Sequence, residues 1–125
     1  MEYEIHLHDD GFFEVVTHGD GDVEVFQKLL RDALEHSDWK PGMPVLVDHS
    51  DFNAGPLTAE DMAALAGMIN ANRVKLGSSR MAILAPGDLQ FALGRMWQAY
   101  LENKWDGTTD IFRSRENALR WLTQP

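Results

Sequence analysis

Apolar and polar positions recur along this chain with two different periods, and these periods predict its strands and helices. Tyr3, Ile5 and Leu7 alternate with polar residues, which is the period of two expected of a half-buried strand. Turn residues follow, and the stretch 12–16 predicts a second strand that pairs with the first as an antiparallel hairpin. We expect the segment Gly19-Asp20-Gly21 to end this hairpin.

Four helices are predicted where apolar residues are spaced three and four apart. Asp22 is suited to cap the first helix. Thr58, with Asp61 three residues later, resembles a capping box at the start of the second helix. The four predicted helices run from Asp22 to Leu34, from Thr58 to Gly77, over residues 89–101 and over residues 115–122.

Short apolar runs between these helices predict the remaining strands. Residues 45–47 are continuously apolar, and so are residues 81–85 of the stretch 80–85, which is typical of central strands covered on both faces. Residues 108–112 are predicted to form a last short strand. Strands that alternate with helices build parallel βαβ units. We therefore expect one α/β domain over residues 1–125, with a mixed sheet of about five strands, the hairpin as its antiparallel edge and about four packed helices.

Composition narrows the classes of partner. The chain has 20 acidic and 11 basic residues and a net charge of −9, which disfavours nucleic acid and anionic membrane surfaces. It has no cysteine, and no apolar run approaches the length of about 20 residues that spans a bilayer. The sequence predicts a soluble, cytoplasmic protein without a cofactor. The charge is explained by solubility, with an acidic face for a basic partner as the alternative.

A polar segment follows the predicted strand 45–47, where open α/β sheets place their sites. This segment, Asp48-His49-Ser50-Asp51, contains the residue types of a hydrolytic site. Adjacent residues of a strand point to opposite faces, so His49 is poorly placed to activate Ser50, and no Gly-x-Ser-x-Gly motif is present. We interpret the carboxylates as capping a loop that runs from Asp48 to Thr58, and a hydrolase as the weaker hypothesis.

The third predicted helix carries a second group of candidate residues. Asp88 begins it, and Phe91, Arg95 and Tyr100 could line a cleft beside the sheet, with the arginine binding an anionic group. The alternative is that this aromatic stripe belongs to the core or to a dimer face. Met62, Met68, Met96, Trp97 and Trp105 could also form an adaptable apolar surface for a partner.

Histidines on the first strand suggest a metal only weakly. His6 and His8 share one face of the predicted strand, and two imidazoles in this spacing can bind zinc or nickel. A third ligand is missing from the pattern, and an exposed polar strand face explains both residues. No metal site is therefore predicted.

Several short sequence segments, in their order along the chain, resemble the SpoIIAA-like family, which is related to STAS and SEC14 (CRAL-TRIO) domains. The segments are Val45-Leu46-Val47-Asp48, residues 80–86, residues 91–96 and the tail 111–122. The resemblance implies a compact α/β domain and non-enzymatic roles. These roles are regulation of a protein partner in the STAS branch and binding of a lipid-like ligand in the SEC14 branch.

The sequence departs from the STAS anti-sigma antagonists at their phosphorylated serine. No Asp-Ser-Ser-Gly-like segment opens the second helix, and the nearest hydroxyl groups belong to Ser50 and Thr58. We assign no phosphorylation site from this resemblance, because a role as helix cap already explains the presence of Thr58.

Three functional hypotheses follow from these residues. The leading one is a non-enzymatic regulatory or protein-interaction module that forms a homodimer and acts through the segment 48–58, the start of the third helix and its apolar surface. The second is a carrier of a small apolar or lipid-like ligand, held between the third helix and the sheet with Arg95 and Tyr100 as polar anchors. The third is a hydrolase that uses His49 and Asp48.

Overall fold

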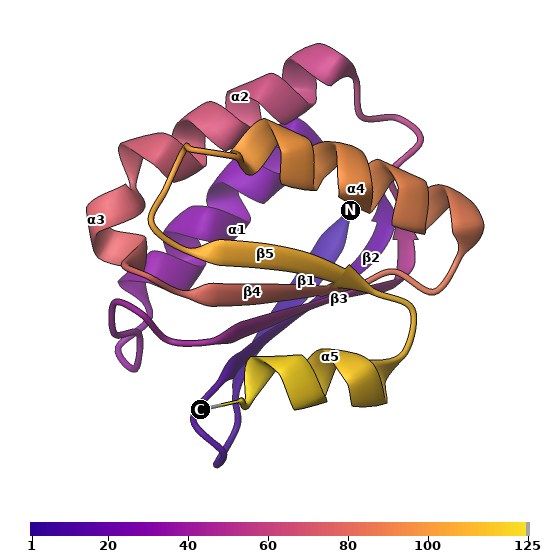
Figure 1. Cartoon of the computed structure of the whole chain (residues 1–125). Coiled ribbons are helices and arrows are strands. Elements are labelled where there is room, and N and C mark those ends of the chain that lie inside the picture. The colour runs from indigo at the N-terminus through magenta and orange to yellow at the C-terminus, as the bar shows by residue number, and fades with distance from the viewer. Residues whose placement is uncertain (125) are drawn as a thin grey trace.

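The computed structural model of the protein describes residues 1–124. A mixed sheet lies between helices, which confirms the predicted fold class (Figure 1). The strands are β1 (Glu2–Leu7), β2 (Phe13–Asp20), β3 (Val45–Asn53), β4 (Arg80–Leu84) and β5 (Thr108–Phe112). The helices are α1 (Val23–Glu35), α2 (Ala59–Ala71), α3 (Arg73–Leu76), α4 (Asp88–Leu101) and α5 (Arg115–Leu122).

The strands lie in the sheet in the same order as in the chain, from β1 to β5. β1 and β2 form the predicted antiparallel hairpin, with Glu2 opposite His18 and Leu7 opposite Phe13. β2, β3, β4 and β5 are parallel to one another. Pairing with β1 ends at His18, so the Gly-Asp-Gly segment ends the hairpin as predicted. The second strand is longer than the predicted stretch 12–16, because β2 continues to Asp20 and its last residues pair with the extended end of β3.

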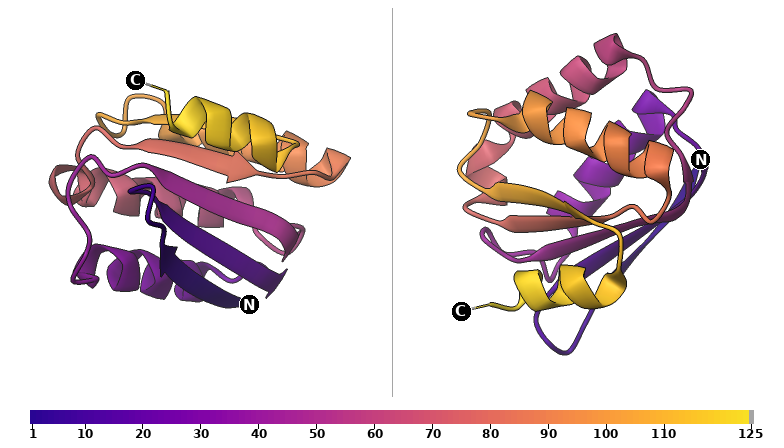
Figure 2. Two further views of the ribbon diagram at one scale, coloured as in Figure 1. Left: turned by 90° about the horizontal axis from the view of Figure 1, so that it is seen from below. Right: turned by 45° about the vertical axis from the view of Figure 1, so that its right-hand side comes forward.

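This strand order places the connecting helices on one face of the sheet. Each parallel strand lies next to the one before it and always on the same side. Because the crossover connections all have the same handedness, their helices lie on the same face of the sheet. The views agree that α1, α2 and α4 lie together on one face and that α5 lies alone on the other (Figures 1 and 2). The molecule therefore has three layers of unequal size.

α2 stands away from the sheet. It packs between α1 and α4, and it makes few direct backbone contacts with any strand. α4 approaches the sheet more closely, because Gly94 leaves room for Ile111 of β5, where an added Cβ would lie 3.0 Å from the isoleucine Cγ2. Only side chains bridge the space between α2 and the strands beneath it.

The opposite face carries a continuous core under α5. Phe12, Leu46, Ala82 and Leu84 come from the sheet side, and they pack on the helix residues Ala118 and Leu122. The predicted tail helix, capped by Ser114, is confirmed, with the Ser114 hydroxyl accepting from the backbone N–H of Asn117 at 3.1 Å. Leu46 is fully buried between its neighbours on this face, whereas Val45 packs toward the other face, so β3 is covered on both faces as predicted.

A buried carboxylate anchors the start of α5 to the sheet. Glu14 of β2 is 6% exposed, and its two oxygens accept hydrogen bonds from the Arg115 guanidinium at 2.7 and 2.8 Å. His8 Nε2 lies 2.6 Å from Glu14 Oε1. These partners hold the pKa of Glu14 below its usual value, with Arg115 as the main cause. A buried charge needs such partners, and here they fix the position of the helix.

The second predicted helix is divided in two, so residues 1–124 contain five helices rather than about four. The break lies at Asn72, whose side-chain amide donates to the carbonyl of Met68 at 2.8 Å. Asparagine competes in this way with the backbone bonds of a helix interior. Gly77 then ends α3 with a φ of 69°, as the sequence predicted for the end of the whole segment.

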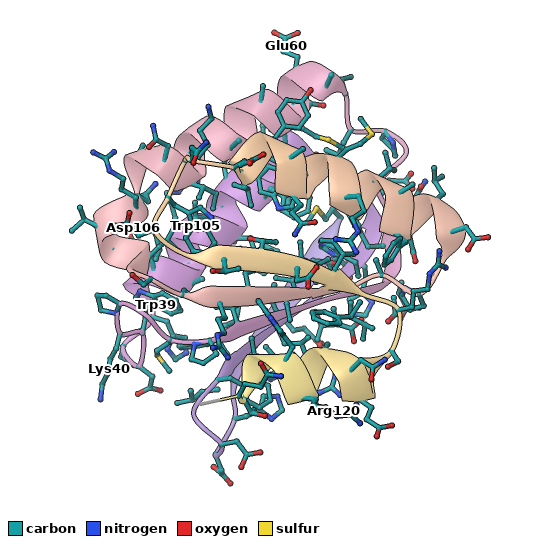
Figure 3. All side chains as sticks on the ribbon, viewed as in Figure 1. Trp39, Lys40, Glu60, Trp105, Asp106 and Arg120 are labelled. Atoms are coloured by element: carbon teal, nitrogen blue, oxygen red, sulfur yellow. The ribbon has the colours of Figure 1, made fainter. Side chains whose placement is uncertain are left out.

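Trp39 and Trp105 close the end of the domain where α3 lies (Figure 3). Both pack against a cluster that contains Ile69, Leu76 and Leu101, and Trp39 Nε1 donates to the carbonyl of Lys75 at 2.8 Å. None of the helices in the described part of the chain is long and apolar enough to cross a bilayer.

Candidate functional site

The polar segment after Val47 belongs to a strand and not to a loop. β3 continues to Asn53, so the predicted loop from Asp48 to Thr58 is wrong for its first six residues. The reason is pairing with β2, in which Val16 lies opposite Asp48 but His18 lies opposite Asp51. β3 thus contains one more residue than β2 between these pairs, which is a β-bulge.

The bulge brings two aromatic side chains of β3 to the same face. Residues three apart point to opposite faces of a regular strand, but the rings of His49 and Phe52 lie 4.4 Å apart between centroids. Phe26 of α1 completes this group, with its ring edge-on to both. The extra residue in β3 therefore builds an aromatic wall on the face that α1, α2 and α4 cover.

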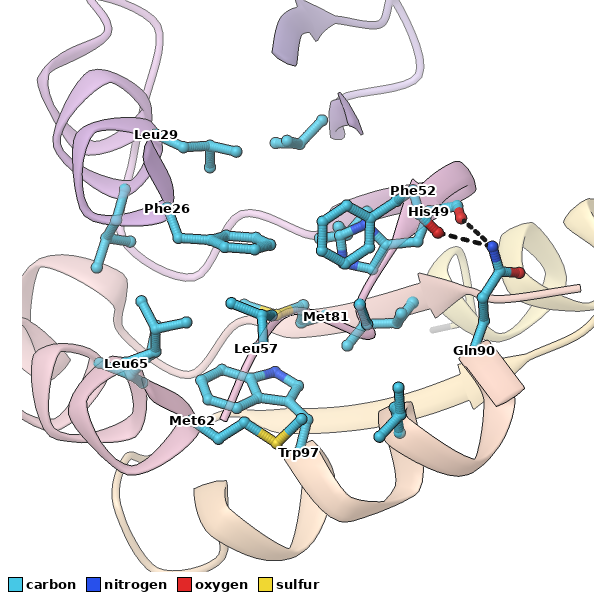
Figure 4. A pocket seen from close by; sticks show the side chains of 18 of the residues that line it. Phe26, Leu29, His49, Phe52, Leu57, Met62, Leu65, Met81, Gln90 and Trp97 are labelled. Carbon is cyan, nitrogen blue, oxygen red and sulfur yellow. Dashed lines mark hydrogen bonds between the residues drawn. The ribbon is translucent and has the colours of Figure 1, made fainter. Parts of the chain in front are cut away.

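A cavity of about 150 Å³ lies behind this wall, in the space between α2 and the sheet (Figure 4). We call it the central cavity. Its side chains come from β2, β3, β4 and three helices, and almost all of them are apolar. They are Val15, Val47, Met81 and Ile83 of the sheet, Phe26, Leu29 and Leu30 of α1, Met62, Leu65, Met68 and Ile69 of α2, Leu93, Gly94 and Trp97 of α4, and His49, Phe52, Ala54, Leu57 and Gln90 at one end.

His49 is a polar side chain of this lining that is held in one orientation. Its Nδ1 lies 2.6 Å from the hydroxyl of Thr17, a residue that is itself fully buried. Although part of the ring faces the cavity, apolar side chains surround it, and burial lowers the pKa of His49 to about 4. The nearby Asp48 carboxylate opposes this shift only weakly. The imidazole is therefore neutral at neutral pH.

Gln90, the other polar residue at this end, has a structural role. Its amide nitrogen donates to the carbonyls of His49 at 3.2 Å and Phe52 at 2.8 Å (Figure 4). Its Oε1 accepts from the backbone N–H of Gly87 at 2.9 Å. Gln90 thus ties the first turn of α4 to the end of β3, beyond the last β3–β4 pair of Asp48 and Leu84.

The other residues of the polar segment lie outside the central cavity. Asp48 faces α5, where its Oδ1 accepts from the backbone N–H and the hydroxyl of Ser50 at 2.9 and 2.6 Å. Its Oδ2 lies 3.9 Å from Arg115. Asp51 lies 3.8 Å from His18 at the surface. Ser50 donates to Asp48 and makes no hydrogen bond with His49 within residues 1–124, so the parts of a hydrolytic site are not assembled.

Thr58 caps α2 as predicted. Its hydroxyl accepts from the backbone N–H of Asp61 at 3.0 Å, and the Asp61 carboxylate accepts from the backbone N–H of Thr58 at the same distance. These reciprocal bonds form a complete capping box with aspartate in place of the usual glutamate or glutamine.

The candidates on α4 do not line the central cavity. Arg95 pairs with Asp110 at 3.2 Å and lies over the ring of Phe91, and Asp88 pairs with Arg113 at 2.7 Å. Tyr100 packs against the cluster closed by Trp39 and Trp105. Arg95 lines a second hollow between α4 and β5, and the anchoring of a ligand by Arg95 and Tyr100 stays a prediction. An amphipathic pattern does not show which side of the helix a long polar side chain takes.

The predicted apolar surface of methionine and tryptophan residues is not formed as one patch. Met62, Met68 and Trp97 point into the central cavity, Trp105 packs at the end of the domain, and Met96 alone of the five is exposed. Within residues 1–124, no group of three or more histidine or acidic side chains is arranged to hold a metal ion.

Comparison with known proteins identifies the fold. The chain is similar over 97% of its length to 92% of an uncharacterised protein of the DUF3478 family from Shewanella loihica PV-4, which has a SpoIIAA-like fold. The TM-score is 0.62 and the sequence identity is 22%. The sequence matches no profile of a known protein family and no curated protein. The SpoIIAA-like fold that the sequence resemblance implied is therefore confirmed, and a likeness at this identity establishes the fold alone.

Sequence reasoning missed most of the cavity lining. Phe26 and Val47 were assigned to ordinary apolar faces, Trp97 to the helix core or to an apolar surface for a partner, and Phe52 to a loop. One signal was available: Val45, Val47 and His49 continue the alternation of a strand, and the aromatic Phe52 follows before the Gly-Pro turn. The bulge, which depends on pairing with β2, has no comparable signal in the sequence.

The buried imidazole predicts a pH dependence of stability. The unfolded state binds a proton on His49 near pH 6.5 and the folded state only near pH 4. Stability therefore falls as the pH drops through this range, by about 3 kcal/mol in total. Urea unfolding of His49→Phe should show a shallower fall than the parent protein, whereas the exposed control His6→Phe should keep the parent slope. Equal slopes in all three proteins would contradict the burial of this ring.

Proposed function

We propose that this protein is a non-enzymatic binding domain whose central cavity holds one small, mainly apolar molecule. The observation that carries the proposal is the cavity itself, with apolar side chains from three helices and three strands around about 150 Å³. Protein interiors are normally packed with few voids larger than a water molecule. A space of this size between well-formed elements therefore calls for an occupant.

The size of the cavity indicates the size of the ligand. An engineered apolar cavity of roughly the same volume in another protein stays dry and binds benzene or xenon. The central cavity is therefore suited to a single aromatic ring with small substituents. A long acyl chain or a sterol requires more room than this conformation offers, so a lipid-like occupant would enter only with its end or after a shift of α2.

Apolar residues of the helices around the cavity are incompletely covered. α1 has a clear apolar face and yet no fully buried residue. Phe26, Leu29 and Leu30 of this face are only partly buried, and so are Val47 in the middle of the sheet and Trp97 of α4. A bound apolar molecule would remove this remaining surface from contact with water, which contributes about 25 cal/mol per Å².

Titration with toluene, followed in amide NMR spectra, tests the proposal. Toluene should shift resonances of residues around the cavity in the parent protein. Val47→Phe places a larger side chain on the sheet side of the cavity. It should weaken binding of toluene by roughly tenfold or more, because the phenyl ring occupies the space that toluene needs. Val74→Phe adds the same group at the exposed surface and should bind like the parent.

Two results would contradict the proposal. One is the absence of toluene binding in the parent protein. The other is equal binding by Val47→Phe with a well-dispersed spectrum, which would place the binding site elsewhere.

A second candidate function, the interaction module expected from the sequence, is favoured by the outer surface of α4. Leu89 and Met96 are 62% and 47% exposed, and Ala92 and Ala99 beside them are exposed as well. Their spacing of three, four and three residues places all four on one stripe. We propose that this stripe is the contact surface of a homodimer, since exposed apolar patches commonly mark such interfaces.

Sedimentation velocity measures this assembly directly. The parent protein should sediment as a dimer at micromolar concentration, and the double variant Leu89→Lys, Met96→Lys should sediment as a monomer because it buries charges in the contact. The single variant Val74→Lys, on α3, should remain dimeric. A monomeric parent protein would contradict the homodimer.

A further inference from the structure

The hydrogen bonds around His49 determine which group of a ligand the central cavity recognises. This inference rests on the proposed function, because it concerns an occupant of the same cavity. The Thr17 hydroxyl has a single proton and two partners: the carbonyl of Asp48 at 3.2 Å and Nδ1 of His49 at 2.6 Å. A carbonyl oxygen can only accept a hydrogen bond. Both contacts are satisfied together only if Thr17 donates to Asp48 and accepts from a protonated Nδ1.

This arrangement leaves Nε2 of His49 as an unprotonated acceptor. A neutral imidazole carries one proton, and Thr17 holds it on Nδ1. No hydrogen bond to Nε2 forms within residues 1–124, and the only enclosed side-chain oxygen or nitrogen without a partner there is Thr109 Oγ1. Nε2 is therefore accessible, and the ring that carries it lines the central cavity. The low pKa of His49 keeps this nitrogen unprotonated at neutral pH.

The rest of the lining offers a ligand no charge. Gln90 already uses its amide nitrogen and oxygen on three backbone groups. No lysine, arginine, aspartate or glutamate lines the cavity. A carboxylate or phosphate in this space would lose its hydration without gaining an opposite charge, at a large cost in free energy. The lining therefore excludes anionic ligands and favours a neutral one.

We propose that the ligand is a neutral molecule with one aromatic ring and one O–H or N–H group, such as a simple phenol or an aniline, and that this group donates a hydrogen bond to Nε2 of His49. The ring fills the apolar part of the cavity between Phe26, Phe52 and Trp97. The hydroxyl or N–H lies at the end closed by β3. Thr17 acts as a positioning residue, because it presents the imidazole in the accepting form.

Three ring compounds of similar size separate this inference from the proposed function. Toluene has no polar group, p-cresol adds a donor, and benzaldehyde carries only an acceptor. Dissociation constants are measured by NMR titration for the parent protein and for His49→Phe, which keeps an aromatic ring in the wall. Binding of toluene by the variant shows that it is folded and that its cavity persists.

We expect the affinity ratio of p-cresol to toluene to fall by roughly tenfold or more in His49→Phe, because a buried hydroxyl then lacks a partner. Benzaldehyde should show no such dependence. If the ratio is unchanged while toluene still binds, the inference is overturned and the proposed function stands. If benzaldehyde gains from His49 instead of p-cresol, the ring donates and the inference is likewise overturned. If no compound binds the parent protein, both fail.

A second readout needs no variant. Long-range proton–nitrogen NMR spectra distinguish protonated from unprotonated ring nitrogens of histidine. At neutral pH, the spectrum of His49 should show a protonated Nδ1 and an unprotonated Nε2, and p-cresol should shift the Nε2 resonance more than toluene does. A protonated Nε2 in the free protein would overturn the inference.

Discussion

Each parallel strand of this sheet lies directly beside the strand that precedes it in the chain, and the arrangement of the helices depends on this order. The connections all reach the same face, where three helices must share the area above four parallel strands. α1 and α4 lie on this face of the sheet, and α2 packs between them with few backbone contacts to the strands. The gap beneath α2 is too wide for its side chains to fill completely, and the central cavity results.

The two faces of β3 carry different groups of side chains. Asp48 and Ser50 point toward α5, where Glu14 and Arg115 anchor that helix. On the other face, the bulge turns His49 and Phe52 together into the cavity wall. The pair of the buried Glu14 with Arg115 thus lies on the side opposite the cavity. In the proposed ligand site, Nε2 of His49 is the one accepting nitrogen, and this is the basis of the proposed preference for neutral molecules.

The sequence was sufficient for the architecture but not for the site. Periodicity predicted the hairpin and the parallel strands, and the Thr58 capping box was recognisable from two residues, because these features depend on local spacing. The polar residues after Val47 were read as a loop, since four hydrophilic side chains in a row outweigh a continuing alternation. Arg95 was placed in a cleft because helical spacing identifies a face but not the direction of a long side chain. The cavity depends on the height of α2 above the sheet, which no local pattern records.

The existence of an open apolar chamber under α2 is the central claim, and a crystal structure of the protein under xenon pressure tests it most directly. Xenon occupies apolar cavities of this size without needing a polar contact. The account predicts xenon density between the sheet and α2, in contact with Leu65, Val47 and Trp97. Side chains closed over this space, with xenon bound only at the surface or not at all, would contradict it.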